Sequence, residues 1–335
     1  MKRDVLVPCG GRWVGSVLAL KAAMAEVPAL AGGRVLVADR DPLTPAGTFA
    51  DGNVQVPAIA APDYIDALLA VCEREGVRVV VPLIDIDMER QAPHKARFEA
   101  IGTTVVSPPP ELVSLCLDKN CFDAFCAQEQ LEVPRRVPSE ALDSADYPLF
   151  GKRVRGFGSV GVGVVQDVSE ARAMEAVAPC IFQEVVDAEE VSVDVYISHT
   201  GALVARVPRV RSKVIGGESI RSRVLDDPSV IALADRTAAA LARRGLWGPA
   251  NIQIFRSEPN KLIEVNTRLG SCTVLSNAAT GGRIYRSMLL EATGGTAEGD
   301  PDDFDRELAI YRFTGDVFYR GDQVTATVPA APGDA

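Results

Sequence analysis

Two polar segments late in the chain carry the side chains best suited to hold a metal ion. They span residues 251–255 (NIQIF) and 263–268 (IEVNTR). Alternate residues of a strand share a face, so Gln253 projects with Asn251, and Glu264 projects with Asn266 and Arg268. We expect two adjacent antiparallel strands that bring a carboxylate and carboxamides together. Oxygen donors of this kind suit Mg²⁺, which takes few protein ligands and keeps water and phosphate.

A glycine-rich segment at residues 156–163 lies between two predicted strands. Glycine permits positive φ and close backbone approach, so successive N–H groups can converge on phosphate oxygens. Lys152, at the end of the preceding strand, and Lys119, on an earlier helix, supply positive charge beside them. No GK[ST] sequence is present, so this is not a Walker loop. The residues predicted to surround the phosphates are Lys119, Lys152, Gly156, Gly158, Ser159 and Gly161.

The segment at residues 183–186 (QEVV) closes a predicted strand. An extended linker there can offer a backbone N–H and C=O to the edge of adenine, while Val185 and Val186 pack on its face. Glu190 follows six residues after Glu184, in a place suited to ribose hydroxyls. Taken alone, the segment also fits an ordinary apolar strand with an exposed pair of glutamates.

Two arginines, Arg209 and Arg211, are predicted to share one strand face. Cations so close together repel each other unless anions lie between them, and they can stabilise a phosphoryl group beside a carboxylate. Arg268 joins them as the third predicted catalytic arginine, because it can reach a transferring phosphoryl group. A solvated basic patch is the alternative reading of residues 206–213.

The elements that must position these residues change character along the chain. In the first third, short apolar strands alternate with helices, which predicts a parallel sheet covered on both faces. These strands span 4–8, 34–39, 77–82 and 103–106, with helices at 14–25, 64–75 and 89–100. A helix at 112–130 follows, and then strands with short, antiparallel connections at 149–154, 161–165, 181–186, 192–198 and 202–210. A helix at 229–244 precedes the last strands, at 251–256 and 261–266.

The first glycine turn, Cys9-Gly-Gly-Arg-Trp-Val-Gly15, lies at the carboxyl end of the first strand, where such sheets bind ligands. Asp39 closes the second strand, as a ribose-binding acid does in a dinucleotide enzyme. A nicotinamide dehydrogenase is therefore an alternative. However, the spacing GGxxxG differs from GxGxxG, and a dehydrogenase leaves the second half of the chain unexplained.

The composition excludes several classes of protein. The 335 residues include 35 Lys plus Arg against 45 Asp plus Glu, a net charge of −10, so nucleic acid is not an expected partner. No segment approaches the roughly 20 apolar residues that span a bilayer. The 7 cysteines form no CxxC pair and the chain has only 2 histidines, which argues against zinc and disulfides. We expect a cytoplasmic protein with no membrane partner.

These motifs, in this order, resemble the ATP-grasp superfamily, and in particular the branch similar to the carbamoyl-phosphate synthase large subunit. The resemblance covers nearly the whole chain. It implies an α/β and α+β fold, in which a Rossmann-like pre-ATP-grasp domain precedes a two-subdomain ATP-grasp fold. The implied divisions are residues 1–113, a small lid subdomain at 114–183, a large subdomain at 184–325 and a flexible tail at 326–335. The motifs are Leu117-Asp-Lys119, Phe122, Pro134, Pro148, Lys152, the glycine segment, Gln183-Glu184, Glu190, Gln253 and Glu264-x-Asn266-x-Arg268.

The resemblance also implies roles for individual residues. Lys119 and Lys152 contact the nucleotide phosphates, and residues 156–163 form a mobile lid. Glu184, Val185 and Val186 meet adenine, and Glu190 meets the ribose. One or two Mg²⁺ ions, with Mn²⁺ as a substitute, bind to Gln253, Glu264 and Asn266. Many members have an acid in place of Gln253, so the number of metal ions is left open.

The function implied is that of an ATP-dependent ligase, which activates a carboxylate as an acyl phosphate and joins it to an amine. We expect ATP, a small carboxylate and an amine acceptor as partners, and a stand-alone amino-acid or peptide ligase. An ATP-grasp carboxylase or kinase and a nucleotide-binding module without turnover are the alternatives. The substrates and the oligomeric state stay open, with a homodimer as one option. Candidate pocket residues are Arg12, Asp85, Asp87 and Arg223.

Overall fold

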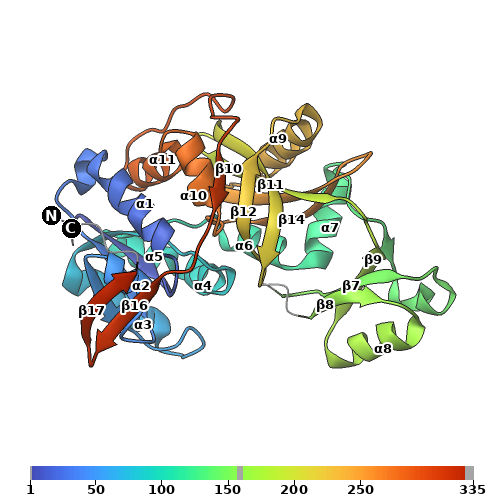
Figure 1. The fold of residues 1–335 in the computed structure, drawn as a ribbon, viewed down its shortest axis with the longest axis horizontal. Coiled ribbons are helices and arrows are strands. Elements are labelled where there is room, and N and C mark those ends of the chain that lie inside the picture. Colours follow the sequence, from blue (N-terminus) through green and yellow to red (C-terminus); the bar gives the residue numbers. More distant parts are fainter. Residues whose placement is uncertain (1, 157–160, 329–335) are drawn as a thin grey trace.

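The computed structural model describes residues 2–156 and 161–328 of the chain. Its N-terminal part is a parallel sheet in the order β3-β2-β1-β4-β5, drawn in blue in Figure 1. Alternate residues of β1 enter separate cores, with Val5 and Val7 on one side and Leu6 on the other, so both faces are covered. This confirms the predicted Rossmann-like unit. Its elements are β1 (Asp4–Pro8), α1 (Val14–Ala25), β2 (Val35–Asp39), α2 (Pro45–Phe49), β3 (Gly52–Gln55), α3 (Tyr64–Glu75), β4 (Val77–Val80), α4 (Asp85–Gln91), α5 (Lys95–Ala100) and β5 (Thr104–Val105).

A large antiparallel sheet forms the middle of the molecule, in the order β14-β13-β10-β11-β12-β15. Its apolar face packs against α6, α7 and α9 in one core. Its other face meets α10 and α11, and a shared core joins Tyr196 of β10 and Met288 of α11 to Val17 of α1. The large sheet is therefore packed directly against the N-terminal unit. Its elements are α6 (Pro110–Leu117), α7 (Lys119–Gln128), β10 (Glu189–Ile197), β11 (Leu203–Ile215), β12 (Glu218–Val224), α9 (Pro228–Arg243), β13 (Gly248–Arg256), β14 (Lys261–Asn266), α10 (Thr273–Ala279), α11 (Arg283–Ala292) and β15 (Ala309–Tyr311).

A small antiparallel sheet, in the order β6-β9-β7-β8, forms a separate lobe with α8. This lobe lies at the right of Figure 1, and the space-filling view shows a hollow between it and the body. β9 ends at Glu184 and β10 begins at Glu189, so residues 185–188 link the two sheets. The elements of the lobe are β6 (Arg136–Val137), β7 (Leu149–Arg153), β8 (Val162–Val165), α8 (Val168–Val177) and β9 (Cys180–Glu184).

The single helix predicted over 112–130 is wrong, because the structure has two helices that meet at Asp118. The backbone of Asp118 is extended, with ψ at 112°, and its carboxylate accepts hydrogen bonds from the N–H groups of Asn120 and Cys121. An aspartate in this role is a preferred N-cap, so it begins α7 instead of continuing α6. The break turns the first residue of α7, Lys119, toward the lobe.

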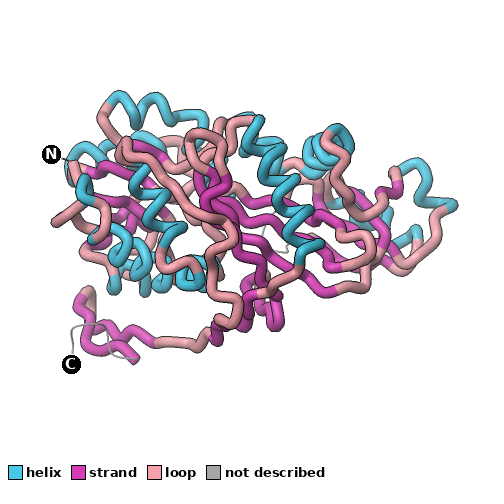
Figure 2. Tube along the Cα trace, turned by 90° about the horizontal axis from the view of Figure 1, so that it is seen from above, coloured by secondary structure: helices cyan, strands magenta, loops and turns pink. Residues whose placement is uncertain are grey.

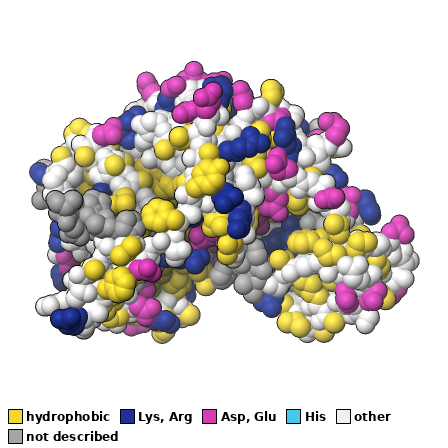
Figure 3. All heavy atoms as spheres, in the orientation of Figure 1, with side chains coloured by type: hydrophobic (Ala, Val, Ile, Leu, Met, Phe, Trp, Pro, Cys, Tyr) yellow, Lys and Arg dark blue, Asp and Glu magenta, His cyan; other side chains and the backbone are white. Residues whose placement is uncertain are grey.

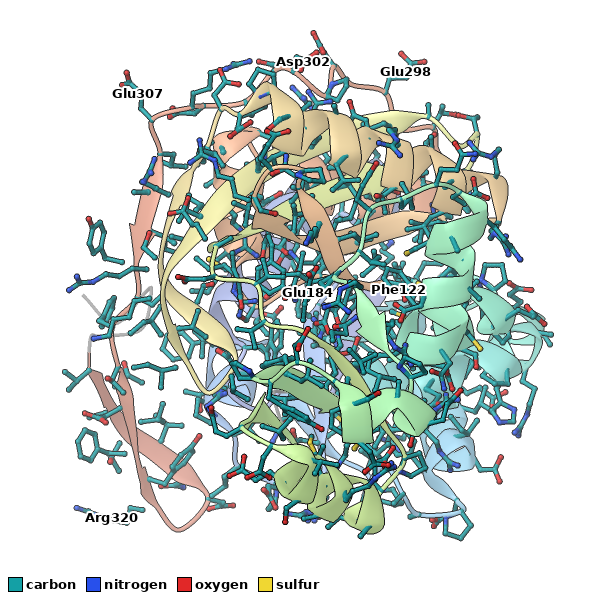
Figure 4. The ribbon with its side chains drawn as sticks, turned by 90° about the vertical axis from the view of Figure 1, so that its right-hand side faces the viewer. Phe122, Glu184, Glu298, Asp302, Glu307 and Arg320 are labelled. Carbon is teal, nitrogen blue, oxygen red and sulfur yellow. The ribbon has the colours of Figure 1, made fainter. Side chains whose placement is uncertain are left out.

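A hairpin of β16 (Asp316–Arg320) and β17 (Gln323–Val328) ends the described chain. Figure 2 shows it beside the body at the end of an extended segment, and Figure 4 shows Arg320 near its turn. Its contact with α2 includes hydrogen bonds of the Tyr319 hydroxyl with Thr48 Oγ1 and Thr44 O, at 2.6 and 3.2 Å. This hairpin was not predicted from the sequence. β17 continues past position 326, where the flexible tail is predicted to begin, and residues 329–335 lie outside the described part.

Two of the expected absences concern membranes and disulfides. Across residues 2–156 and 161–328, no helix has the length and apolar character needed to cross a membrane. All seven cysteines lie in these ranges, and each is a free thiol.

Candidate active site

The polar residues of β13 and β14 lie directly opposite one another. The register pairs Gln253 with Glu264 and Asn251 with Asn266. Gln253 Nε2 and Asn266 Nδ2 both donate to Glu264 Oε1, at 3.1 and 3.3 Å. The predicted adjacency of these strands is confirmed, and it brings together all three side chains predicted to hold a metal ion.

The chemistry of these side chains fits Mg²⁺. Glu264 contributes a carboxylate whose Oε2 accepts no hydrogen bond from any described residue. Rotating either carboxamide presents an oxygen in place of the nitrogen, and O and N of an amide are assigned from their partners. No cluster of three or more His, Cys, Asp or Glu side chains occurs in the described ranges, which argues against a metal site made only of acids and histidines. One acid with two amides suits an ion that retains phosphate and water ligands.

Lys152 reaches this centre from the small lobe. The register places Lys152 and Phe150 on one face of β7, beside Val162 and Val164 of β8, whereas Gly151 faces Met174 on α8. Lys152 is only 6% exposed, and among the described residues no carboxylate lies within ion-pair distance of its ammonium. Burial lowers the pKa of Lys152, and the negative charge of Glu264 opposes that shift. A buried cation without a partner is costly, so this site favours an added anion.

Lys119 and the glycine segment lie beside Lys152. The N–H of Lys119 donates to Val154 O at 3.0 Å, and its ammonium is 3.5 Å from Gly156 O. Gly161 has φ at +69°, a backbone conformation that strains most other residues, so this position favours glycine. The predicted phosphate contacts Gly158 and Ser159 lie outside the described residues.

The linker between the two sheets holds the residues predicted to meet adenine and ribose. The Glu184 carboxylate accepts from the Arg135 N–H at 2.9 Å and pairs with Lys261, and these contacts lower its pKa. Figure 4 shows Glu184 in the middle of the molecule, between the two sheets. Val185 is 41% exposed, and the Val186 N–H donates to no acceptor among the described residues. A free donor beside an exposed apolar side chain suits the edge and face of a base.

Arg211 links the ribose-binding candidate to the metal-binding candidates. Its guanidinium is 3.1 Å from Glu190 Oε2 and donates to Gln253 Oε1 at 2.8 Å and to Gly217 O at 2.9 Å. Arg209 occupies a different environment, since its Nε donates to Asp194 at 2.7 Å beneath α10. Within the part of the chain that the structure describes, buried Arg209 Nη1 has no partner. The structure therefore brings Arg211, but not Arg209, into contact with the centre.

Arg268 is held by a residue of the N-terminal unit. Its Nε and Nη2 donate to the two carboxylate oxygens of Asp85, at 2.8 and 2.5 Å, and Nη2 is 3.5 Å from Asn266 Oδ1. Asp85 was a predicted residue of the substrate pocket, and its pair with Arg268 was not predicted. The two residues are 183 positions apart, so no local pattern links them.

The other pocket candidates lie on both the N-terminal unit and the large sheet. Arg12 lies within the first glycine turn and pairs with Glu218 at 2.5 Å. Asp87 is fully buried and accepts from the Tyr64 hydroxyl at 2.6 Å, while Arg223 lies exposed on β12. The Asp39 carboxylate accepts from the N–H groups of Gly11 and Asp41. Asp39 thus stabilises the first glycine turn by hydrogen bonds. This differs from the ribose-binding role that the dehydrogenase alternative gives to Asp39.

Two family models match the chain. The PylC-like, N-terminal domain matches residues 5–106, and an ATP-grasp domain matches residues 116–272. No curated protein matches the sequence. The narrower resemblance to the carbamoyl-phosphate synthase branch stays a prediction.

Solved structures share the fold at low sequence identity. A biotin carboxylase–βγ-ATP complex from Campylobacter jejuni matches with a TM-score of 0.72 at 18% identity, covering 92% of this chain and 74% of that one. The biotin carboxylase domain dimer of Hydrogenobacter thermophilus 2-oxoglutarate carboxylase, with MgADP and bicarbonate, gives 0.73 at 15%, covering 92% and 73%. An L-amino acid ligase from Bacillus licheniformis gives 0.68 at 18%, covering 89% and 76%.

The two family models meet at the boundary between the N-terminal parallel sheet and the rest of the structure. The first spans the parallel sheet, and the second spans the small lobe and most of the large sheet. The chain belongs to the ATP-grasp superfamily of ATP-binding ligases and carboxylases, with a PylC-like domain ahead of its ATP-grasp domain.

Proposed function

We propose that the chain is a Mg-ATP-dependent ligase that activates a carboxylate as an acyl phosphate and transfers the acyl group to an amine. The observation that supports this most is the set of Glu264, Gln253 and Asn266 on the large sheet, with the buried cation of Lys152 near it on the small lobe. A divalent ion and a triphosphate between them satisfy both sets of charges. Lys119 and Arg211 add positive charge on either side.

In the first step, a carboxylate oxygen of the substrate attacks the γ-phosphorus in line, and the bond to the β-phosphate oxygen breaks to release ADP. Lys152, Lys119 and Arg268 stabilise the charge on the transferring phosphoryl group. Glu264, Gln253 and Asn266 would hold Mg²⁺, which would supply positive charge to the phosphate oxygens. Val185, Val186 and Glu190 hold the adenine and the ribose.

In the second step, the neutral amine attacks the acyl carbon, phosphate leaves with its bridging oxygen, and the amine proton passes to solvent. The balance is one carboxylate, one amine and ATP giving an amide, ADP, phosphate and a proton. The predicted lid at residues 156–163 excludes water, which would otherwise hydrolyse the intermediate. The neighbouring L-amino acid ligase fold supports an amino acid as the carboxylate substrate.

A carboxylase is the second candidate, because biotin carboxylases match the fold with TM-scores of 0.72 and 0.73. In that case bicarbonate is the carboxylate that ATP activates. Both reactions use the same nucleotide site, so they are separated by the substrates that stimulate phosphate release.

The test is a phosphate-release screen with Mg-ATP, run with single amino acids, pairs of amino acids and bicarbonate. We expect an amino-acid pair to stimulate release and to give a condensed product, detected by mass spectrometry with the mass of one water lost. Stimulation by bicarbonate alone favours the carboxylase. No phosphate release above that of Glu264→Ala in any mixture contradicts both.

A further inference from the structure

The ion pair between Arg268 and Asp85 joins two parts of the chain at the edge of the candidate active site. Its two hydrogen bonds, 2.8 and 2.5 Å, run from adjacent nitrogens of the guanidinium to both carboxylate oxygens. The side chains are only 16% and 9% exposed. Bidentate geometry with so little exposure fixes the direction of the guanidinium far better than a single surface contact does.

The element that carries Asp85 is itself fixed against the large sheet. Asp85 is the first residue of α4, and Met88, one turn later, packs with Ala92 and with Val113 of α6. The Thr267 hydroxyl lies 3.3 Å from Met88 Sδ. α4 therefore contacts the residue just before Arg268 as well as Arg268 itself, so the position of the carboxylate is set by packing.

From Arg268 a line of polar contacts continues across the sheet. Arg268 Nη2 is 3.5 Å from Asn266 Oδ1, and Asn266 and Gln253 both donate to Glu264. Gln253 in turn accepts from Arg211 at 2.8 Å. A displacement of Arg268 would reach the predicted metal ligands directly, because Asn266 is one of them and contacts Arg268.

We propose that Asp85 is a positioning residue: it holds Arg268 in the orientation that serves phosphoryl transfer, and so makes the N-terminal domain part of the catalytic site. The inference rests on the proposed function, because it needs Arg268 to act on the transferring phosphoryl group. A misplacement of such a group by about 1 Å lowers the rate by about 100-fold, so the loss of its support is measurable.

The chain offers a matched control for this ion pair. Asp4 binds the Nε and Nη2 of Arg34 at 2.8 and 2.6 Å, and its side chain is 10% exposed, against 9% for Asp85. Asp4 begins β1, the central strand of the parallel sheet, and lies at the opposite end of that strand from the first glycine turn. Both Arg34 nitrogens meet one oxygen of Asp4, and Arg34 is 47% exposed against 16% for Arg268. Replacing Asp4 therefore breaks a buried-aspartate to arginine pair away from the candidate active site.

The experiment is a double-mutant cycle on phosphate release, with the acceptor mixture that gives the highest wild-type rate. We expect Asp85→Asn to lower kcat by about 100-fold. The KM for ATP should change by less than about 3-fold, because the nucleotide contacts are intact. Asp85→Glu should restore part of the loss. In an Arg268→Ala background, Asp85→Asn should cost less than about 2-fold further, since the two changes remove one interaction. Asp4→Asn should leave kcat unchanged, even where its melting temperature falls.

Each other outcome is decisive. If the losses of Asp85→Asn and Arg268→Ala multiply, Asp85 does not act through Arg268 and the inference alone is overturned. If Asp4→Asn lowers kcat as much as Asp85→Asn, the effect is one of stability and the inference is again overturned. If Arg268→Ala keeps the wild-type rate, the role proposed for Arg268 is wrong, and the inference is overturned with it. Wild-type protein that releases no phosphate overturns the proposed function as well.

Discussion

One face of the large sheet carries two groups of polar side chains with different surroundings. Beneath α10, Asp194 accepts hydrogen bonds from Arg209, Asn251, Thr273 and Ser276, at 2.6 to 3.0 Å. Toward the small lobe, Glu264 receives, among the described residues, only the carboxamide nitrogens of Gln253 and Asn266, both on one oxygen. Both acids face the same way, from β10 and β14, the two strands that flank β13. The difference is that helices cover one group and leave the other open.

This contrast shows why residue type alone does not define a functional site. Burial raises the pKa of Asp194, but the charge of Arg209 and the hydrogen bonds outweigh it and lower the pKa overall. Such a group is satisfied within the protein and has no need of a ligand. By contrast, the negative charge of Glu264 and the positive charge of Lys152 have no counter-charge within ion-pair distance among the described residues. A metal ion would neutralise the first and a phosphate the second. We therefore place Arg209 with the structural group, as a proposal that revises its predicted catalytic role.

The largest expected effect is that of Glu264→Ala, which removes the one charged ligand of the proposed metal site. Phosphate release should fall by about 10,000-fold, equivalent to about 5 kcal/mol. The melting temperature should stay close to that of the wild type, because the carboxylate makes few contacts. Glu307→Ala, on the exposed loop labelled in Figure 4, is the control and should keep the wild-type rate. Near-normal turnover in Glu264→Ala would remove the metal site.

Asp194→Asn should lower the stability of the fold and leave the Mg-ATP site of the folded protein unchanged. It leaves the guanidinium of Arg209 buried without its counter-charge, which typically costs about 3–4 kcal/mol. Urea unfolding should show this loss, while the folded fraction keeps its affinity for Mg-ATP. If the Asp194→Asn protein is stable but has lost its turnover, the result would support the catalytic role first predicted for Arg209.

Asp87 is a third buried acid and extends the comparison. It receives hydrogen bonds from Tyr64 and Gln91, its Oδ2 has no partner among the described residues, and burial raises its pKa to about 6. Since the folded pKa exceeds the ordinary value of 3.8, the unfolded chain releases this proton first, and stability falls as the pH rises from about 4 to 6. Asp87→Asn should therefore raise the free energy of unfolding by about 2–3 kcal/mol at pH 8 and leave it nearly unchanged at pH 4. Equal effects at both pH values would contradict this.

The smallest effect concerns Lys152. Its replacement by Met should weaken Mg-ATP binding by about 30-fold, or about 2 kcal/mol, the scale of a hydrogen bond to a charged group. Burial lowers the pKa of Lys152, and a bound phosphate would raise that pKa. The affinity of the wild type for Mg-ATP should therefore be greatest at pH values below the lowered pKa, where Lys152 is charged. The affinity should decline as the pH rises through that pKa. Lys152→Arg keeps its charge and should remove this decline. Calorimetry between pH 7 and 10 measures both, and a flat wild-type profile would show that no anion meets Lys152.

The sequence predicted the fold best where apolar periodicity was strong. The limits of β1, α1, α3 and β14 agree with the structure. Asp118 was missed as a helix start because an aspartate between two apolar helical runs also fits the polar face of one longer helix. α10 and α11 were not predicted, since Gly281 and Gly282 separate two short helices. The final hairpin was not predicted, although the residues of β17 alternate in the manner of a strand.

For the site, local spacing predicted which side chains share a strand face but not what covers that face. The pairing of Gln253 with Glu264 followed from the alternation in two neighbouring strands. By contrast, Arg209 and Arg211 look equivalent in sequence, and only α10 distinguishes them. The pairs Asp85–Arg268 and Glu184–Lys261 join segments distant in sequence and depend on the packing of whole domains.

The most direct test of the account is calorimetric titration of the wild-type protein with ATP, with and without magnesium, beside Glu264→Ala and Lys152→Met. The account predicts one nucleotide site per chain whose affinity depends on magnesium. It also predicts that Glu264→Ala abolishes the magnesium dependence and that Lys152→Met weakens binding with magnesium present. No heat of binding in the wild type, or binding that neither substitution alters, would contradict the proposal that Glu264 and Lys152 hold the two sides of one Mg-ATP site.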